Sequence, residues 1–490
     1  MASPHLVKPH PRRQHGARAL FREVGMGGMV VGRRGVIAGG VGLLAGASAR
    51  PTVAADRPID VLVIGGGLAG LIAARDLAKD GHRVLMLEAR PRLGGRVAWD
   101  QLAGQAVDSG GTWFHWHQAA IWREVQCYEL EVVERPVADR YFIGVGGAFR
   151  AMTPEELDGR LRRGLAAFWG DPALQAALAT PFAVQASGDR LAALDRMSVE
   201  DRLRAIRLDP VDDSALRAIF SDFGRPLDQV SLAWAMQRMA NGLWTYESFM
   251  ALFAVYRLRG TMRALCEAIR ADGGFDLRLD APVTQVVQGA GGVLVRTADG
   301  TAFAARAAVV ATPVEAWRAI RFSPELPADH RQAAAEGMAA PRLCNFILHV
   351  RGLPGVVNSF APAGIEPFEF TFTHSTIDDG QLLSAYAMEG AIGVRDGAAR
   401  LETALRRFVP EARLAGFVGH DWGREPFSLG GSGSLKLGQM ARFVDRLDRP
   451  IGRLCFAGAD FAPQFAGFLT GAIESGARAA RRIGGILGRG

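Results

Sequence analysis

The sequence has little cysteine, and the arrangement of its cysteines excludes the common metal sites. No two of them form a C-x-x-C pair, and no histidine stands at the spacing of a zinc site, so we predict no metal centre. Each cysteine lies among apolar residues, which favours buried free thiols. The four are Cys127, Cys266, Cys344 and Cys455.

The chain also lacks an excess of charge of either sign outside its first 55 residues. Eight of the 57 basic residues and one of the 50 acidic residues lie in residues 1–55, so the remaining chain is balanced. The net charge of +7 therefore comes from the N-terminal segment alone. This balance argues against nucleic-acid binding by the rest of the protein.

No apolar run is long enough to span a membrane. The run Val36–Ala49 is short, follows the pair Arg33-Arg34 and precedes small residues at Val53-Ala54-Ala55. A basic region, a short apolar stretch and a small-residue cleavage site are typical of a secretory signal. The paired arginines predict a twin-arginine leader over residues 1–55 and a periplasmic or exported protein. The alternative is an uncleaved extension with a chance arginine pair and a cytoplasmic protein.

The strongest chemical signal follows this leader. Ile59–Ile64 is rich in β-branched residues and predicts a buried strand, and Val84–Leu87 predicts a second one. Between them, Gly65–Gly70 reads G-x-G-x-x-G and opens a helix that extends to about Asp80. These glycines allow a tight turn, a close approach of the backbone to a pyrophosphate and close helix–strand packing. The order of these elements predicts a Rossmann-type dinucleotide site.

Two features after the second strand narrow the choice of dinucleotide. Glu88, at the strand end, can accept hydrogen bonds from a ribose diol and would repel the 2′-phosphate of NADP. It does not distinguish NAD from FAD. The segment Arg90–Arg96 then places a glycine pair between arginines, which offers a second close backbone approach and a cation for the pyrophosphate.

The segment VLVIGGGLAGLIAARDLAKDGHRVLMLEARPRLGGRV resembles the opening of the flavin-dependent amine oxidase family. Further blocks with the same resemblance follow in order: Asp108–Trp113, Arg259–Thr261, Ala281–Val283, Val309–Pro313, Asp421–Gly430, Leu454–Asp460 and Gly467–Gly476. Within the family, GGTWFHWHQAAIWREVQCYELEVVE, WTYESF and WGREPFSLG resemble bacterial nicotine oxidoreductases and pseudooxynicotine amine oxidases. The resemblance covers about 59–483 and implies an extended FAD.

The resemblance implies a set of residues that bind FAD. They come from the G-x-G-x-x-G turn, the end of the second strand, the second glycine pair, the loop Asp108–Trp113 and the C-terminal blocks. The expected cofactor residues are Gly65, Gly67, Leu68, Ala69, Gly70, Glu88, Ala89, Arg90, Gly94, Gly95, Arg96, Gly110, Gly111, Thr112, Trp113, Val283, Trp422, Gly458, Asp460, Phe468, Leu469 and Ala472. The covalent-flavin cysteine of some members would align near Gly431, so the FAD is expected to be non-covalent.

Family chemistry implies hydride transfer from the C–H bond beside an amine nitrogen to flavin N5, and hydrolysis of the resulting imine to a carbonyl compound. No side-chain nucleophile is required, and we assign no general base. The family often steers the amine with two aromatic side chains. Phe468 falls on one of these positions, whereas Ser432 falls on the other. Nicotine-type enzymes usually have Asn where Phe468 stands, so both positions favour a substrate of different shape from nicotine. Trp113, Trp244 and Tyr246 are the other candidate pocket walls.

Lysine is nearly absent: Lys8, Lys79 and Lys436 are the only three, and the first two fall in the leader and the Rossmann helix. In many family members a lysine near the flavin anchors a water at N5. The absence of this lysine predicts a slow reaction of the reduced flavin with oxygen. It favours a protein electron acceptor, such as a periplasmic cytochrome c, over oxygen itself.

The sequence therefore predicts an α/β fold with a discontinuous Rossmann-type FAD-binding domain and an α+β substrate domain. The FAD domain is expected at 56–135, 250–312 and 420–490, and the substrate domain at 136–249 and 313–419. Three alternatives to amine oxidation stay open: an L-amino-acid oxidase with a buried arginine, a desaturase-like flavoenzyme, and a flavin-binding protein without turnover. The choice between a monomer and a homodimer is open as well.

Overall fold

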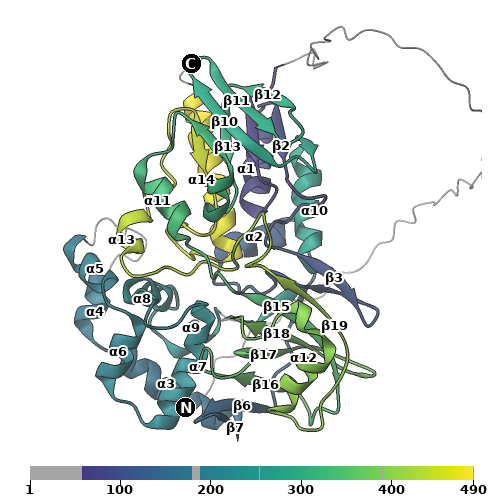
Figure 1. Ribbon diagram of the computed structural model, residues 1–490, viewed down its shortest axis with the longest axis vertical. Coiled ribbons are helices and arrows are strands. Elements are labelled where there is room, and N and C mark those ends of the chain that lie inside the picture. The colour runs from purple at the N-terminus through teal and green to yellow at the C-terminus, as the bar shows by residue number, and fades with distance from the viewer. Residues whose placement is uncertain (1–57, 179–187, 253, 389, 489–490) are drawn as a thin grey trace, which may run out of the picture. The chain divides into compact units, whose positions relative to one another are not determined.

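A parallel five-stranded sheet carries the first glycine-rich turn. The computed structural model describes residues 58–178, 188–252, 254–388 and 390–488, so the predicted leader lies outside the described residues. Every neighbouring pair in this sheet is parallel. In spatial order its strands are β20 (Leu454–Phe456), β13 (Ala307–Val310), β1 (Val61–Ile64), β2 (Val84–Leu87) and β9 (Asp276–Arg278). The sheet therefore joins strands from the beginning, the middle and the end of the described chain (Figure 1).

Three helices pack beside this sheet: α1 (Leu68–Lys79), α10 (Thr261–Gly273) and α14 (Leu469–Leu487). Helix α1 contacts both of the others, and α14 also contacts α2 (Ala119–Cys127). The contact between α1 and α14 is a backbone contact, because a Cβ atom on Gly476 would lie 2.2 Å from the carbonyl oxygen of Ala69. Because Gly476 has no side chain, the first and the last helix of the described chain can pack in direct backbone contact.

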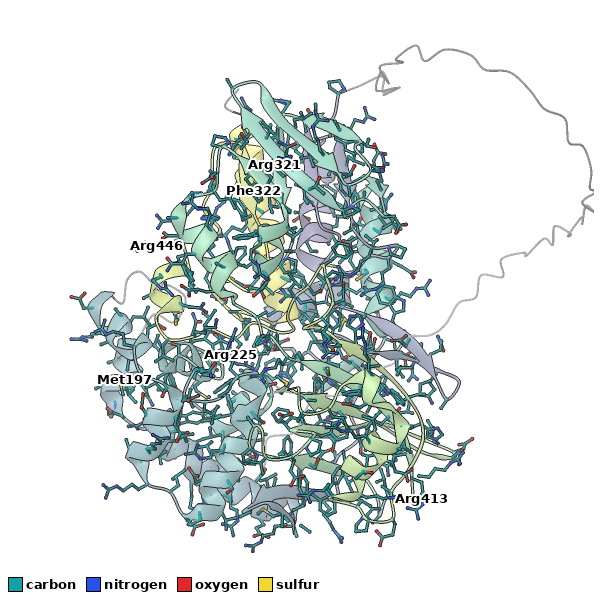
Figure 2. The ribbon with its side chains drawn as sticks, viewed as in Figure 1. Met197, Arg225, Arg321, Phe322, Arg413 and Arg446 are labelled. Atoms are coloured by element: carbon teal, nitrogen blue, oxygen red, sulfur yellow. The ribbon has the colours of Figure 1, made fainter. Side chains whose placement is uncertain are left out.

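A second sheet of four strands continues from β9. Its strands, in spatial order, are β12 (Ala302–Ala305), β11 (Gly292–Thr297), β10 (Val283–Gly289) and β14 (Arg321–Ser323). Arg321 and Phe322 of β14 are labelled in Figure 2. The segment after β14 forms α11 (Ala328–Glu336), which packs against α13 (Gln439–Phe443).

A seven-stranded sheet forms the other large β structure. Its order is β19 (Arg413–Asp421), β15 (Cys344–Arg351), β18 (Gly380–Ala387), β17 (Phe370–Ile377), β16 (Val357–Phe360), β6 (Arg140–Val145) and β7 (Ala148–Met152). Helix α12 (Gly397–Arg406) packs against β19. In β17 and β18, Phe370, Phe372 and Tyr386 alternate with other residues along paired strands, so their side chains share one face.

A helical segment connects β7 to the remaining strands. It contains α3 (Pro154–Trp169), α4 (Pro172–Ala177), α5 (Gly188–Asp195), α6 (Val199–Ile206), α7 (Pro210–Phe220), the short 3-10 helix η2 (Ser221–Phe223), α8 (Leu232–Asn241) and α9 (Tyr246–Met250). All ten residues of α8 are buried. Two small ribbons, β3 (Trp99–Leu102) with β4 (Gln105–Asp108) and β5 (Val132–Glu134) with β8 (Tyr256–Leu258), complete the β structure.

Most local predictions are confirmed. The two strands and the helix around the G-x-G-x-x-G turn form as β1, α1 and β2. Thr153 caps α3 by accepting a hydrogen bond from Glu156 N at 3.2 Å, with Pro154 in the first helical position.

The prediction that all four thiols are buried is wrong for Cys127, which is exposed because it closes the amphipathic helix α2 on its outer side. Cys266, Cys344 and Cys455 are buried. Among the described residues, no group of acidic, histidine and cysteine side chains could hold a metal ion. Within the same residues, none of the helices combines the length and the hydropathy that crossing a bilayer requires.

The predicted domain boundaries stay a prediction. The strands of the five-stranded and seven-stranded sheets nevertheless come from the segments assigned to the FAD and substrate domains. Strand β14 joins the four-stranded sheet although it lies a few residues beyond the expected boundary at 312.

The contact between α1 and α14 predicts opposite effects for two glycine substitutions in one helix. Gly476→Ala should lower the free energy of unfolding by about 1–3 kcal/mol, because the new methyl group would overlap the backbone of Ala69. Gly484→Ala should raise it by about 0.5–1 kcal/mol, because nothing lies within 4 Å of its added Cβ atom and alanine is the better helix former. Urea unfolding of both variants measures the difference, and equal stability of the two would contradict the contact.

Candidate flavin and amine site

One cavity of about 540 Å³ is lined by residues from both glycine-rich ends of the chain. Gly65, Gly67, Leu68 and Ala69 line it from the start of α1, and Gly458, Phe468, Leu469 and Ala472 line it from the region around the start of α14. The first turn of neither helix contains an acidic residue, and no described side chain caps either one. Free backbone N–H groups and two positive dipole ends therefore face the same space, which suits a pyrophosphate.

The glycines of the first turn are required by geometry. Gly65 has a φ of +105°, and a Cβ atom there would lie 2.8 Å from Ala311 O. A Cβ atom on Gly70 would lie 2.0 Å from Gly65 O. Gly70 lies outside the cavity lining, and its lack of a side chain allows α1 to pack closely on the turn. Its place among the cofactor residues stays a prediction.

Glu88 lines the cavity at the end of β2 and is buried. Its Oε2 accepts a hydrogen bond from Gly66 N at 2.6 Å, and its Oε1 accepts one from Arg90 N at 2.9 Å. Each oxygen keeps a second lone pair, so the carboxylate orders both glycine-rich loops and can still accept from a ribose hydroxyl.

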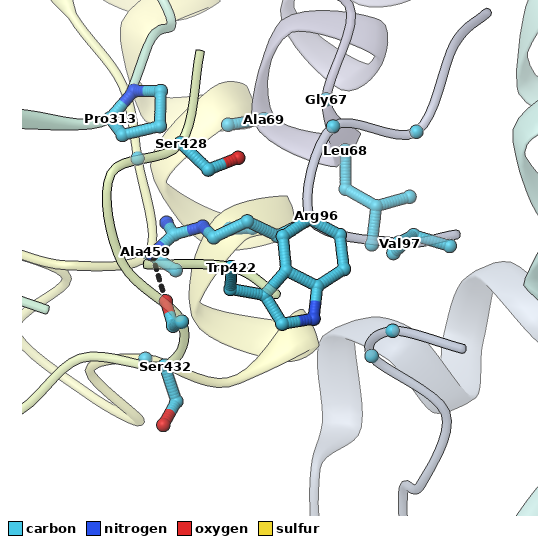
Figure 3. Close-up of a pocket in the computed structure, with 18 of the residues that line it drawn as sticks. Gly67, Leu68, Ala69, Arg96, Val97, Pro313, Trp422, Ser428, Ser432 and Ala459 are labelled. Atoms are coloured by element: carbon cyan, nitrogen blue, oxygen red, sulfur yellow. Dashed lines mark hydrogen bonds between the residues drawn. The ribbon is translucent and has the colours of Figure 1, made fainter. Parts of the chain in front are cut away.

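Arg96 crosses the cavity between the two ends of the chain (Figure 3). Its Nη1 donates to Gly431 O at 2.7 Å and to Asp460 Oδ1 at 2.6 Å, and its Nη2 donates to Asp460 Oδ2 at 3.1 Å. Asp460 is buried, lies outside the cavity lining and binds Arg96 through both of its oxygens. It therefore holds Arg96 in place, and its direct contact with the cofactor stays a prediction.

Arg90 also lines the cavity, but its guanidinium is already bonded. Its Nε donates to Glu425 at 2.8 Å, and its Nη2 donates to Ser428 Oγ at 2.8 Å. Trp422 is buried beside Gly110, where an added Cβ atom would lie 2.9 Å from the indole ring. The remaining predicted cofactor residues that line the cavity are Ala89, Gly94, Gly95, Gly110, Gly111, Thr112, Trp113 and Val283.

Asp108, which ends β4 just before this glycine loop, is buried and accepts a hydrogen bond from Met262 N at 2.9 Å. Burial raises the pKa of Asp108 to about 7, although this hydrogen bond and the nearby Arg257 oppose the shift. The carboxyl group thus joins the loop Ser109–Trp113 to the start of α10, because Met262 is the second residue of that helix.

The aromatic half of the site is divided among several elements. Trp113 donates from Nε1 to the hydroxyl of Tyr386 at 3.2 Å, and both residues line the cavity. Phe468, Phe370 and Phe372 line it as well. The period-two spacing of Phe370 and Phe372 in the sequence was the available signal that both face one side of a strand.

Ser432 lines the cavity, as predicted, on a loop that the helical segment holds in place. Its carbonyl accepts from Ala340 N at 2.8 Å. Arg225, labelled in Figure 2, donates from Nη2 to Ala339 O at 2.6 Å and from Nε to Ser434 O at 3.0 Å. The buried guanidinium thus ties this loop to the neighbouring segment that contains Ala339 and Ala340.

Two of the predicted pocket walls, Trp244 and Tyr246, lie outside the residues that line the cavity. Tyr246 packs under Arg162 at 4.2 Å and bonds to Asp158, so it belongs to a contact between α9 and α3. His115, Trp116 and His117 also lie outside the lining, and His115 instead stacks on Tyr256.

An ion pair that was not predicted from the sequence lies in the cavity wall. Asp222 of η2 and Arg238 of α8 both line the cavity, and Arg238 Nη2 donates to Asp222 Oδ2 at 2.6 Å. A single charged residue within the apolar helix LAWAMQRMAN was the signal that could have pointed to Arg238.

A family model described as flavin containing amine oxidoreductase matches residues 68–484. The chain belongs to this family. As a flavin amine oxidoreductase it uses FAD, and the α/β fold class, the cofactor and the oxidation of an amine are confirmed. None of the four cysteines lines the cavity, which agrees with a flavin that is not bound through a cysteine.

Two curated relatives support the predicted place within the flavin amine oxidoreductases. The chain is 32% identical to the nicotine dehydrogenase of Pseudomonas putida over 447 residues, which are 89% of this chain and 90% of the relative. It is 30% identical to a pseudooxynicotine dehydrogenase of a Pseudomonas species, over 87% of this chain and 86% of the relative. A solved structure of putrescine oxidase with bound putrescine superposes with a TM-score of 0.75 at 22% identity, over 88% of this chain and 99% of that one.

Glu88 provides the test of the cofactor site. Glu88→Gln should weaken FAD binding by about 1.5–3 kcal/mol. In the variant an NH₂ group takes the place of one carboxylate oxygen, so one of the two backbone N–H groups loses its acceptor and the negative charge is lost. Flavin absorbance retained after dialysis measures the loss. Glu155→Gln on exposed α3 is the control and should retain wild-type flavin content. Equal flavin content in both variants would show that Glu88 does not organise the site.

Proposed function

We propose that this flavin amine oxidoreductase oxidises a secondary or cyclic amine in an enclosed, mainly apolar chamber. The observation that carries the proposal is that one cavity contains both the dinucleotide-binding residues and a chamber walled by Trp113, Phe370, Phe372, Tyr386 and Phe468. Bound FAD supplies the acceptor for the hydride. The nicotine and pseudooxynicotine dehydrogenases named above support an amine carried on or near a ring.

The chain's own residues would bind the amine, orient it and keep water away from it. Phe468 stands at the start of α14 beside the cofactor residues Leu469 and Ala472. Ser432 leaves the chamber wider on its side than an aromatic residue would. Because the chamber is dominated by hydrocarbon and aromatic surface, it favours the neutral form of the amine, which is the form that can be oxidised.

The L-amino-acid alternative is less well supported. It requires a buried arginine that is free to bind a carboxylate, and the arginine that lines this chamber, Arg238, already pairs with Asp222. Three aromatic rings also lie around its guanidinium, those of Phe223, Trp234 and Phe468.

We further propose that the electron acceptor is a redox protein rather than oxygen. Neither of the described lysines lines the cavity. Lys79 pairs with Asp272, and Lys436 donates to Glu336 O. A lysine beside the flavin would supply a positive charge that favours reduction of oxygen, and neither described lysine is available for that role.

Anaerobic mixing of the purified yellow protein with a panel of amines tests the proposed reaction. Secondary and cyclic amines should bleach the flavin absorbance at least about tenfold faster than L-amino acids, a difference of about 1.4 kcal/mol in barrier. The reduced sample is then divided and exposed to oxygen or to an oxidised cytochrome c. Faster reoxidation by cytochrome c supports the proposed acceptor, and rapid reoxidation by oxygen counts against it. Absence of bleaching by any amine would contradict the proposed substrate class.

We propose that the protein acts outside the cytoplasm, on the basis of Arg33-Arg34 and the apolar run that follows them. Replacement of both arginines by lysine should abolish export, because twin-arginine signals are read as a paired guanidinium motif. Flavin content and immunoblotting of periplasmic and cytoplasmic fractions measure the result. Removal of residues 1–55 is the matched control and should leave an active cytoplasmic enzyme. Unchanged periplasmic amounts in the lysine variant would overturn this proposal.

A further inference from the structure

Asp222 is the acidic member of an ion pair that the amine chemistry itself does not require. It lies in η2 and lines the same cavity as Phe468 and Tyr386. Its side chain is 33% accessible, and its place in the lining opens it to the cavity. Burial raises the pKa of its carboxyl group, whereas the adjacent Arg238 favours the charged form.

The two members of the pair differ in what they can still bind. Asp222 Oδ2 accepts from Arg238 at 2.6 Å, and Asp222 has no other hydrogen-bond partner among the residues that the structure describes. Its Oδ1 therefore remains free to accept. Arg238 is the opposite case, since its side chain is only 8% accessible. Its guanidinium lies 4.9–5.3 Å from the ring centroids of Phe223, Trp234 and Phe468.

Arg238 fixes the position of the carboxylate relative to the reacting end of the chamber. Its guanidinium carbon lies 4.9 Å from the ring centroid of Phe468, and its Nη2 donates a hydrogen bond to Asp222. Arg238 therefore contacts both Asp222 and Phe468 in the wall of the cavity. Aromatic side chains line the same cavity, among them those of Phe468 and Tyr386. A carboxylate next to aromatic rings is a good environment for a substituted ammonium ion.

We infer that Asp222 binds a second, positively charged nitrogen of the substrate, so that the enzyme selects amines that carry two basic groups. This inference rests on the proposed function, since it assigns the far end of the same substrate. The nitrogen at Asp222 keeps its proton in the ion pair and cannot be the one that is oxidised. The oxidised nitrogen lies at the Phe468 end, where the wall is apolar. A neutral pyridine nitrogen can only accept hydrogen bonds, and a carboxylate can only accept them as well, so a pyridine ring would not bind to Asp222 through its nitrogen.

Matched monoamines and diamines test this assignment. The probes are hexylamine with hexamethylenediamine, and N-methylbenzylamine with its para-aminomethyl derivative. Dissociation constants come from the change in flavin absorbance on anaerobic mixing before reduction, and reduction rates come from the subsequent bleaching. In at least one pair, the wild-type enzyme should bind the diamine about tenfold or more tightly than the monoamine, as expected for one charge-assisted hydrogen bond.

Asp222→Asn should reduce this preference to about one while changing monoamine binding by less than about twofold, because the variant loses the charge and keeps the shape. Asp222→Glu retains the charge and should retain a preference for the diamine. The exposed Asp228→Asn, on the loop that follows η2, is the matched control and should behave as the wild type. Flavin content and thermal unfolding of each variant show which variants fold. If Asp222→Asn does not fold, the diamine preference of Asp222→Glu is compared with that of the wild type instead.

Three outcomes would overturn the inference. The first is a wild-type enzyme that does not distinguish either pair of probes. The second is a diamine preference that persists in Asp222→Asn. The third is an equal loss of monoamine and diamine binding in that variant, which would place the reacting amine itself at Asp222. Binding of the diamine through Asp222 without any bleaching would support the site and contradict the proposed oxidation, so the two failures are distinguishable.

Discussion

The close approach of α1 and α14 is the constraint on which the site depends. Gly476 allows the backbone of the last helix to reach Ala69 in the first, and Gly70 allows the first helix to reach its own turn. As a result, two uncapped helix N-termini face one cavity. Arg96 completes the arrangement, because its bonds to Gly431 and Asp460 connect the second glycine motif with the C-terminal loops. Neither helix alone would provide a site for an extended dinucleotide.

Glycine motifs were readable from the sequence because their meaning is local. The turn requires a positive φ at Gly65 and the absence of a side chain at Gly70, whose added Cβ atom would overlap Gly65 O. Both glycines belong to one short motif, so both requirements can be seen in the sequence. The strand end at Glu88 is predictable for the same reason, since its two backbone partners belong to adjacent loops. Most of the cofactor half of the site is therefore predictable from the sequence.

The amine half of the site was only partly predictable, because its walls come from distant segments. Trp244 and Tyr246 belong to an aromatic-rich stretch that resembled a pocket segment, yet Tyr246 faces α3 instead. Phe370, Phe372 and Tyr386 face the cavity because of the pairing of β17 with β18, which the sequence does not reveal. The pair of Asp222 and Arg238 depends on the packing of η2 against α8, and neither residue type is informative without its partner.

The position of α14 has a consequence for how the protein is made. A growing chain on the ribosome would contain β1, α1 and Glu88 long before it contained α14, whose N-terminus faces the same cavity. FAD capture would therefore have to wait until α14 is made, and a chain truncated before Leu469 would lack one of the two helix N-termini that face the cofactor. Acquisition of yellow colour would thus report that translation has passed α14.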